Sequence, residues 1–502
     1  MSATDDTNGN VVQTLPAHAR RLHLLGVGGT GMGTLACMLK ERGFEVTGSD
    51  QNLYPPMSLV LEKANIPLFT PYAAQNVEAA KPDMVVVGNV IRRENPEAAA
   101  VRARGLPQMS MPALLWEVFL KHKHVVCVAG THGKTTTAMW LAHVLASAGL
   151  RPSWLVGGIS AQDGKGHGLG EGAHFVIEGD EYDTAYFDKG PKFFHYRPKT
   201  LVLTSIEYDH ADIYADMQAY ESAFQRLTQG MPQDGYIAVS AGYPNAVRMA
   251  HASPCPAHTY AARPPSPAVD FQPSRLRFSA TGAQFEVEKN GRRLGMFSLA
   301  LSGFQNVENA LGIVAAGLSL GLSVEALQAG LQSFQGVLRR QETKVLKTNA
   351  GEDGLVLVDD FAHHPTAVKE TVQGIGERFG GRRLWALFEP RSNTSRRKLH
   401  QKDYAKAFAE ASLVRIRRPL PHDKISPEEA LDVELLAQSL RAQGKDAQVV
   451  DDVDTLVEEL ATHAQATDVV LCMSNGSFDG LLSKLLQRFT SHPEYESARS
   501  PA

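Results

Sequence analysis

Glycine loops follow apolar runs at two places in the chain, and the first lies near its start. Residues 21–27 are largely apolar and predict a strand, residues 26–33 contain five glycines, and residues 34–42 predict a helix. A second strand, residues 45–48, leads to Asp50, which lies about twenty positions after the loop. The pattern predicts a strand, a glycine loop, a helix and a second strand in succession.

The second glycine loop starts at residue 130. Residues 125–129 form an apolar run rich in valine, residues 130–137 read Gly-Thr-His-Gly-Lys-Thr-Thr-Thr, and residues 138–148 contain no helix breaker. We expect a strand that leads through a short loop into a helix.

Further apolar runs extend the pattern to the end of the chain. Strands are expected at residues 84–88, 175–177, 201–204, 354–358, 383–388, 413–416, 447–450 and 469–473, and a helix at residues 306–320. Asn290-Gly291, between residues 285–287 and 294–297, predicts a hairpin, whereas the proline-rich residues 253–273 predict an irregular chain. Because strands alternate with helical segments in the last third, a parallel sheet is expected there.

The length of 502 residues exceeds what one hydrophobic core usually holds. The elements predict an α/β protein of three domains. We expect a Rossmann-like N-terminal domain at residues 20–118, a central P-loop ATPase-like domain at residues 119–335 and a C-terminal Rossmann-like domain at residues 336–490. Residues 1–19 are expected to form a disordered tail and residues 491–502 a second tail.

Composition narrows the class of protein. Hydrophobic residues make up 43% and charged residues 21%, and the net charge is −4, so neither nucleic acid nor a membrane is an expected partner. Cys37, Cys127, Cys255 and Cys472 are far apart, which predicts free thiols in a reducing compartment. Without a signal-peptide pattern or an apolar run of about 20 residues, a cytoplasmic protein is expected.

The first glycine loop has the chemistry of a diphosphate site. Glycines let a pyrophosphate approach a helix N-terminus, and an acidic residue further on takes ribose hydroxyls. The residues expected to act in this way are Gly26, Gly28, Gly29, Gly31, Met32 and Asp50. The same geometry suits NAD and a UDP-sugar, so both ligands remain open.

The second loop suits a nucleoside triphosphate. Amide N–H groups at a helix N-terminus attract phosphate, Lys134 would reach the β- and γ-phosphates, and the Thr135 hydroxyl would bind Mg²⁺. The usual loop has a glycine where this chain has Val128, so the loop that starts at Gly130 is a shorter variant. The alternative is an ordinary strand-to-helix turn with a surface lysine.

Acidic residues follow two strands of the same predicted sheet. Four acids lie within residues 178–183, and Asp209 and His210 follow the next strand. Because Mg²⁺ prefers oxygen ligands beside phosphates, we expect a metal site here with ligands from these acids, and a second-metal or phosphate role for His210. The alternative is a solvated acidic loop.

These motifs resemble the Mur ligase family of peptidoglycan synthesis over residues 21–486. The motifs stand in the family's order, and they are residues 130–136, Glu178, Asp209-His210, Asn306 with Asn309, Arg339-Arg340, and Asp360 with His363-His364-Pro365. The resemblance implies an ATP-dependent carbon–nitrogen ligase that uses Mg²⁺ and an acyl phosphate.

The resemblance also implies roles for single residues. It implies ATP binding by Gly130, Thr131, His132, Gly133, Lys134, Thr135, Thr136, Asn306, Asn309, Arg340 and Asp360. It also implies metal binding by Thr135, Glu178 and His210, with Glu181 as the alternative to Glu178, and catalysis by Lys134 and His210. The first glycine loop would hold a UDP-sugar. A peptide would be bound at two strand ends in the last third of the chain, by Arg391, Ser392, Asn393, Ser474 and Asn475. The alternative for Arg391 is that it lies on the surface or contacts phosphate and does not bind the peptide.

Two departures narrow the branch of the family. Several branches of the family carry a carbamylated lysine where this chain has Ala223-Phe224. The absence of that lysine resembles the alanine-adding branch and its relatives. Gln305 stands where a histidine is common, and we assign it no role. Residues 54–58, 178–189, 388–394 and 473–476 look closer to the branch that joins recycled L-alanyl-γ-D-glutamyl-meso-diaminopimelate to UDP-N-acetylmuramate. These two compounds are the expected substrates, in peptidoglycan recycling.

Three alternatives remain open. A UDP-N-acetylmuramate–L-alanine ligase shares the same motifs. An NAD-dependent oxidoreductase would explain the first glycine loop and Asp50 but not Lys134 or the acidic clusters. A non-catalytic P-loop regulator would bind ATP and a partner protein without using a carboxylate or an amine as substrate.

Overall fold

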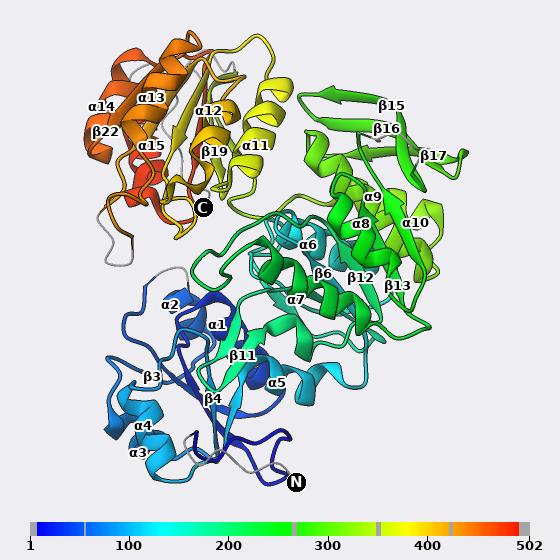
Figure 1. Cartoon of the computed structure of the whole chain (residues 1–502), viewed down its shortest axis with the longest axis vertical. Helices are drawn as coiled ribbons and strands as arrows, with labels where there is room; N and C mark the ends of the chain where they lie inside the picture. The colour runs from blue at the N-terminus through cyan, green and yellow to red at the C-terminus, as the bar shows by residue number, and fades with distance from the viewer. Residues whose placement is uncertain (1–7, 55–56, 264–268, 348–352, 421–424, 491–502) are drawn as a thin grey trace. The chain divides into compact units, whose positions relative to one another are not determined.

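The computed structural model describes residues 8–54, 57–263, 269–347, 353–420 and 425–490, and the chain forms two compact units (Figure 1). The first unit comprises Met1–Glu207, Met217–Phe271 and Ala310–Leu331, and the second comprises Tyr208–Asp216, Gln272–Asn309 and Gln332–Ala502. The predicted α/β class is confirmed, because each unit contains a largely parallel sheet covered by helices.

The N-terminal sheet of the first unit is parallel and has the strand order β3-β2-β1-β4-β5. Its strands are β1 (Arg21–Leu25), β2 (Glu45–Ser49), β3 (Leu68–Phe69), β4 (Met84–Val87) and β5 (Gln108–Ser110). Its helices are α1 (Thr30–Glu41), α2 (Met57–Lys63), α3 (Ala74–Ala80), α4 (Pro96–Ala103) and α5 (Met111–Leu115), and a π-helical turn, Trp116–Leu120, follows α5. The strand order reverses between β1 and β4, where such sheets bind ligands at the strands' carboxyl ends.

Two details of the N-terminal sheet and its surroundings differ from the sequence-based predictions. Helix α1 begins at Thr30 and not at residue 34, with Gly29 as its N-cap, so Gly31 and Met32 lie in its first turn. Glycine lowers helix propensity, but the close approach of Gly33 to Met57 and Val27 favours it there. Within the segment expected as a tail, Val11 forms a parallel bridge to Gln108 of β5.

The central sheet of the first unit contains the second glycine loop. In spatial order its strands are β14 (Ala257–Tyr260), β13 (Tyr236–Ser240), β12 (Thr200–Leu203), β6 (His124–Ala129), β9 (His174–Gly179), β7 (Ser153–Leu155) and β8 (His167–Gly168). All neighbours pair in parallel except β7 and β8. The accompanying helices are α6 (Lys134–Ser147), α7 (Met217–Gln229) and α8 (Pro244–His251), together with the 3₁₀ turn Lys192–His195. A separate hairpin is formed by β10 (Asp183–Ala185) and β11 (Asp188–Pro191).

The second unit contains a hairpin and a six-stranded sheet. The hairpin of β16 (Gly282–Lys289) and β17 (Arg292–Leu299) turns at Asn290 and Gly291, which have φ angles of 49° and 73°, as the sequence predicts. Strand β15 (Phe271–Ser279) precedes this hairpin, and α9 (Phe304–Ser319) and α10 (Val324–Ser333) follow it in the chain. Residues Ala310–Leu331 of these two helices belong to the first unit.

The six-stranded sheet has the order β18-β19-β23-β20-β21-β22 and is parallel except for the edge strand β18. Its strands are β18 (Glu342–Lys347), β19 (Asp353–Asp360), β20 (Leu384–Phe388), β21 (Leu413–Arg417), β22 (Asp446–Val450) and β23 (Val469–Met473). Its helices are α11 (Pro365–Arg378), α12 (Gln401–Ala407), α13 (Val433–Ala442), α14 (Val453–His463) and α15 (Leu481–Thr490), with 3₁₀ turns at Lys398–His400 and Phe478–Gly480.

Alternate residues of β19 enter two separate cores, which explains the helices on both faces of this sheet. Val356 and Val358 pack with residues of α11 to α13, whereas Leu355 and Leu357 pack with residues of α14 and α15. The yellow-to-red part of Figure 1 shows this sheet with its helices.

The expectation of an irregular chain at residues 253–273 was wrong for part of that stretch. Residues 257–260 form β14, which pairs in parallel with β13, and β15 begins at Phe271. The neighbouring strand outweighs the local proline signal; residues 264–268 lie outside the described residues. Among the described residues, no helix combines the length and the apolar character needed to cross a bilayer.

Candidate active site

Asp50, directly after β2, accepts a hydrogen bond from the first glycine loop. The Gly28 N–H donates to Asp50 Oδ2 at 2.8 Å, and a Cβ atom on Gly28 would lie only 2.9 Å from that oxygen. The Gln51 N–H donates to Asp50 Oδ1 at 2.7 Å. The Tyr72 hydroxyl also bonds to Asp50, and its pKa is raised by burial first and then by that carboxylate. Asp50 therefore holds the glycine loop in place.

The second loop needs glycine at its first position. Gly130 has a φ of 136°, and a Cβ atom there would lie 2.3 Å from Thr204 Oγ1 and 2.7 Å from Ser205 N. Gly133, with a φ of 77°, is the N-cap of α6, which starts at Lys134. The order of strand, loop and helix around Lys134 is the one the sequence predicts, but α6 begins at Lys134 and not at residue 138.

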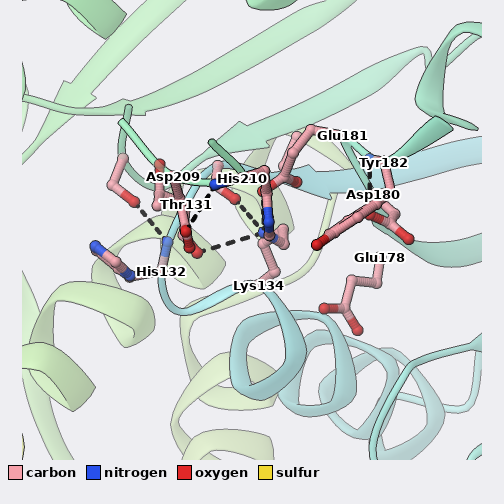
Figure 2. A network of polar contacts seen from close by, with 12 residues as sticks. Thr131, His132, Lys134, Glu178, Asp180, Glu181, Tyr182, Asp209 and His210 are labelled. Atoms are coloured by element: carbon pink, nitrogen blue, oxygen red, sulfur yellow. Dashed lines mark hydrogen bonds and ion pairs between the residues drawn. The ribbon is translucent and has the colours of Figure 1, made fainter. Parts of the chain in front are cut away.

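Lys134 is a mostly buried cation held against its own loop. Its Nζ lies 3.0 Å from Glu181 Oε1, 2.5 Å from Gly130 O and 3.3 Å from Thr131 O (Figure 2). Burial alone would lower the pKa of Lys134, but Glu181, Glu178 and Asp180 outweigh it and raise that pKa. A surface lysine on an ordinary turn would not have these partners.

Glu178 and Glu181 face different groups, although Glu178 lies at the end of β9 and Glu181 follows directly after that strand. Thr135 Oγ1 donates to Glu178 Oε1 at 2.8 Å, and the Gly157 N–H donates to Glu178 Oε2 at 2.9 Å. Glu181 pairs with Lys134 and accepts the Tyr220 hydroxyl at 3.2 Å. Hydroxyl and carboxylate oxygens together suit Mg²⁺, so the geometry favours Glu178 over Glu181 as the ligand.

Asp180 is ionised and paired within the same acidic stretch. Its Oδ2 lies 2.5 Å from Lys192 Nζ, and its Oδ1 accepts the Tyr182 N–H at 3.0 Å. Burial disfavours the charged carboxylate, but these two partners and Lys134 lower its pKa to about 2. Asp180 thus ties the acidic stretch to Lys192 just after β11.

Asp209 and His210 belong to the second unit, whereas Thr135 and Glu178 belong to the first. His210 has a φ of 57°, and its N–H donates to Asp209 Oδ1 at 2.7 Å and to Thr394 Oγ1 at 3.1 Å. Burial would raise the pKa of Asp209, but His210, His363 and His364 outweigh it and lower that pKa. Hydrogen bonds to Asp209 and Thr394 therefore fix the backbone of His210.

The predicted nucleotide residues of the second unit lie on α9 and after β19. Asn306 and Asn309 are buried one turn apart, and Asn306 Nδ2 donates to Ser302 O at 2.7 Å. Asp360 accepts the Gln341 N–H at 2.8 Å and the Ala362 N–H at 2.7 Å, and burial raises its pKa although Arg340 opposes this. The Arg340 guanidinium lies 4.5 Å from the centre of the Phe361 ring.

The residues expected to bind a peptide lie at the carboxyl ends of two neighbouring strands, β20 and β23. Arg391 is exposed and lies against Gly476, where a Cβ atom would be 2.3 Å from Arg391 Nη1. Asn475 Oδ1 is buried without a hydrogen-bond partner among the described residues. Ser392 Oγ bonds to Ser395 at 2.9 Å, whereas Asn393 is half-buried.

Sequence reasoning did not identify three residues that contact the proposed site residues, namely Tyr72, Lys192 and Tyr220, and it placed Glu389 in a polar cluster at a strand end without giving it a role of its own. Glu389 is buried after β20 and accepts a hydrogen bond from Ser474 Oγ. Glu389 was visible as an acid at a strand end, which is a usable signal. Tyr220 lies within the amphipathic helix α7 and looks like any buried aromatic residue.

Comparison with known proteins gives three matching family models. Residues 21–123 match "Mur ligase family, catalytic domain", residues 128–317 match "Mur ligase middle domain", and residues 340–476 match "Mur ligase, glutamate ligase domain". Together they cover most of the chain in the order of the three predicted domains.

Two curated relatives are similar over nearly their whole length. Both are called UDP-N-acetylmuramate–L-alanyl-γ-D-glutamyl-meso-2,6-diaminoheptandioate ligase. The Haemophilus influenzae protein is 36% identical, over 93% of this chain and 99% of its own, and the Escherichia coli protein is 37% identical, over 94% and 99%.

A solved structure shows the same fold. The murein peptide ligase of Psychrobacter arcticus has a TM-score of 0.69 and 34% identity, over 94% of this chain and 99% of its own. The three matched models and these near full-length similarities agree with the fold and with the order of the motifs. This chain belongs to the Mur ligase family.

Proposed function

We propose that this protein is an ATP-dependent ligase that joins L-alanyl-γ-D-glutamyl-meso-diaminopimelate to UDP-N-acetylmuramate, a step of peptidoglycan recycling. The two curated relatives support the choice of substrates. The observation that carries the ligase chemistry is the Thr135–Glu178 contact beside Lys134, because a cation and oxygen ligands for Mg²⁺ are what phosphoryl transfer requires. A dehydrogenase has no use for that set.

The chemistry must first activate a carboxylate, which resonance makes a poor electrophile. A carboxylate oxygen of UDP-N-acetylmuramate bonds to the γ-phosphorus of ATP, and ADP leaves. The tripeptide amine then bonds to the acyl carbon, the bond from that carbon to the phosphate oxygen breaks, and the nitrogen loses a proton. The protein's contribution to both steps is positioning and charge stabilisation.

We assign the charge stabilisation to Lys134, whose burial strengthens its interaction with an anion. Thr135 and Glu178 would hold Mg²⁺, with His210 as a further ligand and catalytic residue, and Mg²⁺ supplies a compact positive charge when it is bound. Glu181 has a different role in this proposal, since it neutralises Lys134 and accepts the Tyr220 hydroxyl.

The remaining predicted residues divide between three ligands. We assign ATP to the loop residues Gly130 to Thr136 and to Asn306, Asn309, Arg340 and Asp360. The UDP-sugar is assigned to the loop Gly26 to Met32, with Asp50 as its support, and the peptide to Arg391, Ser392, Asn393, Ser474 and Asn475. These assignments correspond to three domains, at residues 20–118, 119–335 and 336–490. Because ATP and a UDP-sugar are intracellular metabolites, we place the protein in the cytoplasm.

The test supplies ATP, Mg²⁺ and UDP-N-acetylmuramate with either the tripeptide or free alanine, and identifies the product by mass. We expect the tripeptide adduct, ADP and phosphate in equal amounts, and no product without Mg²⁺. An alanine adduct as the main product would make the protein an alanine-adding ligase instead.

A binding experiment separates the other two alternatives. We expect labelled UDP-N-acetylmuramate, and not labelled NAD, to bind the parent protein. Binding of NAD alone would support the oxidoreductase. ATP hydrolysis that is unaffected by UDP-N-acetylmuramate and by the tripeptide would support the P-loop regulator.

A further inference from the structure

The hairpin of β10 and β11 has no part in the chemistry described so far, yet it touches both ligand-binding sheets of the first unit. It leaves the central sheet directly after the acidic stretch of residues 178–182 and returns at Lys192. Tyr186 and Phe187 form its tip, with their ring centres 4.9 Å apart. Its strands are only three and four residues long, so partners outside the hairpin must hold it.

The tip of the hairpin packs against the core of the N-terminal sheet. Ala185 is 1% exposed and packs with Leu25 of β1 and Val87 of β4, and Tyr186 and Phe187 cover the same cluster. These two strands end where the first glycine loop starts, between β1 and α1. The hairpin therefore packs beneath the proposed UDP-sugar site.

Directional contacts fix the hairpin at this position. The Tyr186 hydroxyl donates to Gln108 Oε1 at 2.8 Å and accepts from Arg102 Nη1 at 3.1 Å. Ser110 Oγ donates to Asp188 Oδ2 at 2.9 Å, and His195 Nε2 lies 2.9 Å from the same oxygen. Hydrogen bonds from two residues of β5 thus fix where the tip lies on the sheet.

The base of the hairpin is attached to the phosphate loop. Asp180 is paired with Lys192 at 2.5 Å, so the two ends of the hairpin are held together. The next residue, Glu181, is completely buried and is paired with Lys134 at 3.0 Å. One continuous segment of the chain therefore contacts the ATP-binding lysine at one end and the UDP-sugar sheet at the other.

We propose that this hairpin aligns the two ligand sites, with Tyr186 and Asp188 as positioning residues. The inference rests on the proposed function, since it takes ATP and UDP-N-acetylmuramate as the two ligands. Their reacting atoms are carried by different sheets, and an error of about 1 Å in their alignment costs roughly 10²-fold in rate. Loosening the tip should therefore slow the reaction without weakening the binding of either ligand.

The test combines Tyr186→Phe with Ser110→Ala, which removes the tyrosine hydroxyl and the hydroxyl that binds Asp188 while keeping the apolar packing. We expect kcat to fall about tenfold or more, with the dissociation constants for UDP-N-acetylmuramate and ATP measured separately and unchanged. Ser110→Thr keeps a hydroxyl and should keep more of the parent kcat than Ser110→Ala. The matched control is Lys189→Ala, which removes an exposed ion pair with Asp183 on the same hairpin and should leave kcat unchanged.

A parent-like kcat in the double variant would overturn the inference, and so would a loss explained entirely by weaker binding of UDP-N-acetylmuramate. A parent protein that makes no adduct at all would instead refute the proposed function. In that case the alignment role of the hairpin is tested by hydrogen–deuterium exchange of the protein without substrates. Faster exchange at residues 130–134 and 178–182 in the double variant supports the alignment role, and unchanged exchange there rejects it.

Discussion

The Lys134 side chain is already engaged in contacts within the protein. Its charge is balanced by Glu181, and its ammonium group contacts two carbonyl oxygens of its own loop. An arriving triphosphate brings more negative charge than one carboxylate, so the lysine can exchange these contacts for phosphate oxygens without an uncompensated buried charge. The resting contacts keep the lysine protonated and close to the place where it is needed.

Lys134→Ala should therefore abolish turnover and leave the binding of UDP-N-acetylmuramate nearly intact, since that ligand is assigned to the other sheet. Loss of a key charge stabiliser costs about 10²-fold or more in kcat. Steady-state kinetics and calorimetric titration of the same preparation give both quantities. A variant that keeps about a third of the parent activity would contradict the role of Lys134.

Glu178 and Glu181 provide a paired test, because they lie three positions apart but have different partners. Glu178→Gln keeps the size of the side chain and removes its charge, so the Mg²⁺ concentration needed for half-maximal rate should rise about tenfold or more. Glu181→Gln should leave that concentration unchanged while it lowers the overall rate through Lys134. If both variants keep the parent's response to Mg²⁺, the metal site lies elsewhere.

His124 predicts how stability depends on pH. Burial, then His174 and Lys199, lower its pKa from 6.5 to about 4, and its Nε2 lies 2.9 Å from Thr200 Oγ1. Between those two pH values the unfolded chain binds more protons at this position than the folded chain, so its contribution to stability is lost as the pH falls. The urea midpoint of the parent should therefore fall more steeply between pH 6.5 and pH 4 than that of His124→Gln. Parallel curves would contradict this role of His124.

At this scale the sequence was most informative where chemistry and spacing coincide. Lys134 and Thr135 could be named because they stand at fixed positions between a strand and a helix. The choice between Glu178 and Glu181 could not be made from the sequence, because both follow the same predicted strand and only side-chain direction separates them. Tyr220 could not be found either, since its hydroxyl meets Glu181 from a helix 39 residues further on.

At the scale of elements, buried parallel strands were the easiest to predict. In the last sheet, β20 to β23 lie within about one residue of the expected ranges, because such strands are nearly continuous apolar runs. Strand β18 was missed, since it lies at the edge of that sheet and consists of exposed and half-buried residues without a buried apolar run. Likewise, the start of α1 was placed too late, because the glycines in its first turn have a low helix propensity and look like a continuation of the loop.

The β10–β11 hairpin shows why some elements escape prediction altogether. Its strands are too short for a periodic signal, and its stability comes from contacts such as that between Tyr186 and Gln108, 78 residues apart in the chain. No local pattern encodes a pairing over that distance. Residues 178–189 could be recognised as distinctive in the sequence, but the role of the hairpin depends on the sheet against which it packs.

At the scale of the whole molecule, all three sheets follow one rule, which is that polar groups gather at the carboxyl ends of parallel strands. Asp50, Glu178 and Asp360 each stand at or just after the end of such a strand. The sequence predicts this arrangement once the strands are known, because their direction and order determine which ends meet. In the proposed function, the substrate bound at each edge depends on few residues, and the edge of β20 and β23 is the one assigned to the peptide.

Selection of the peptide is the last prediction and concerns the complete reaction. A site for free alanine needs only a small crevice, whereas the tripeptide carries several carboxylates and needs donors along a longer surface. Arg391 is exposed at the end of β20, beside the Ser474–Gly476 segment that follows β23, and can bind a carboxylate bidentately. Arg391→Ala should therefore raise the KM for tripeptide about tenfold or more while the KM for ATP changes little.

The matched control for Arg391 is Lys398→Ala, which removes another exposed cation from the same stretch of the second unit and should leave both KM values as they are in the parent. Free alanine should be a poor substrate for the parent, because it offers only one carboxylate to this edge. Equal increases in the KM for tripeptide and for ATP would place Arg391 on the phosphate side. Efficient ligation of alanine alone would show that the edge selects a single amino acid, and the protein would then be an alanine-adding ligase.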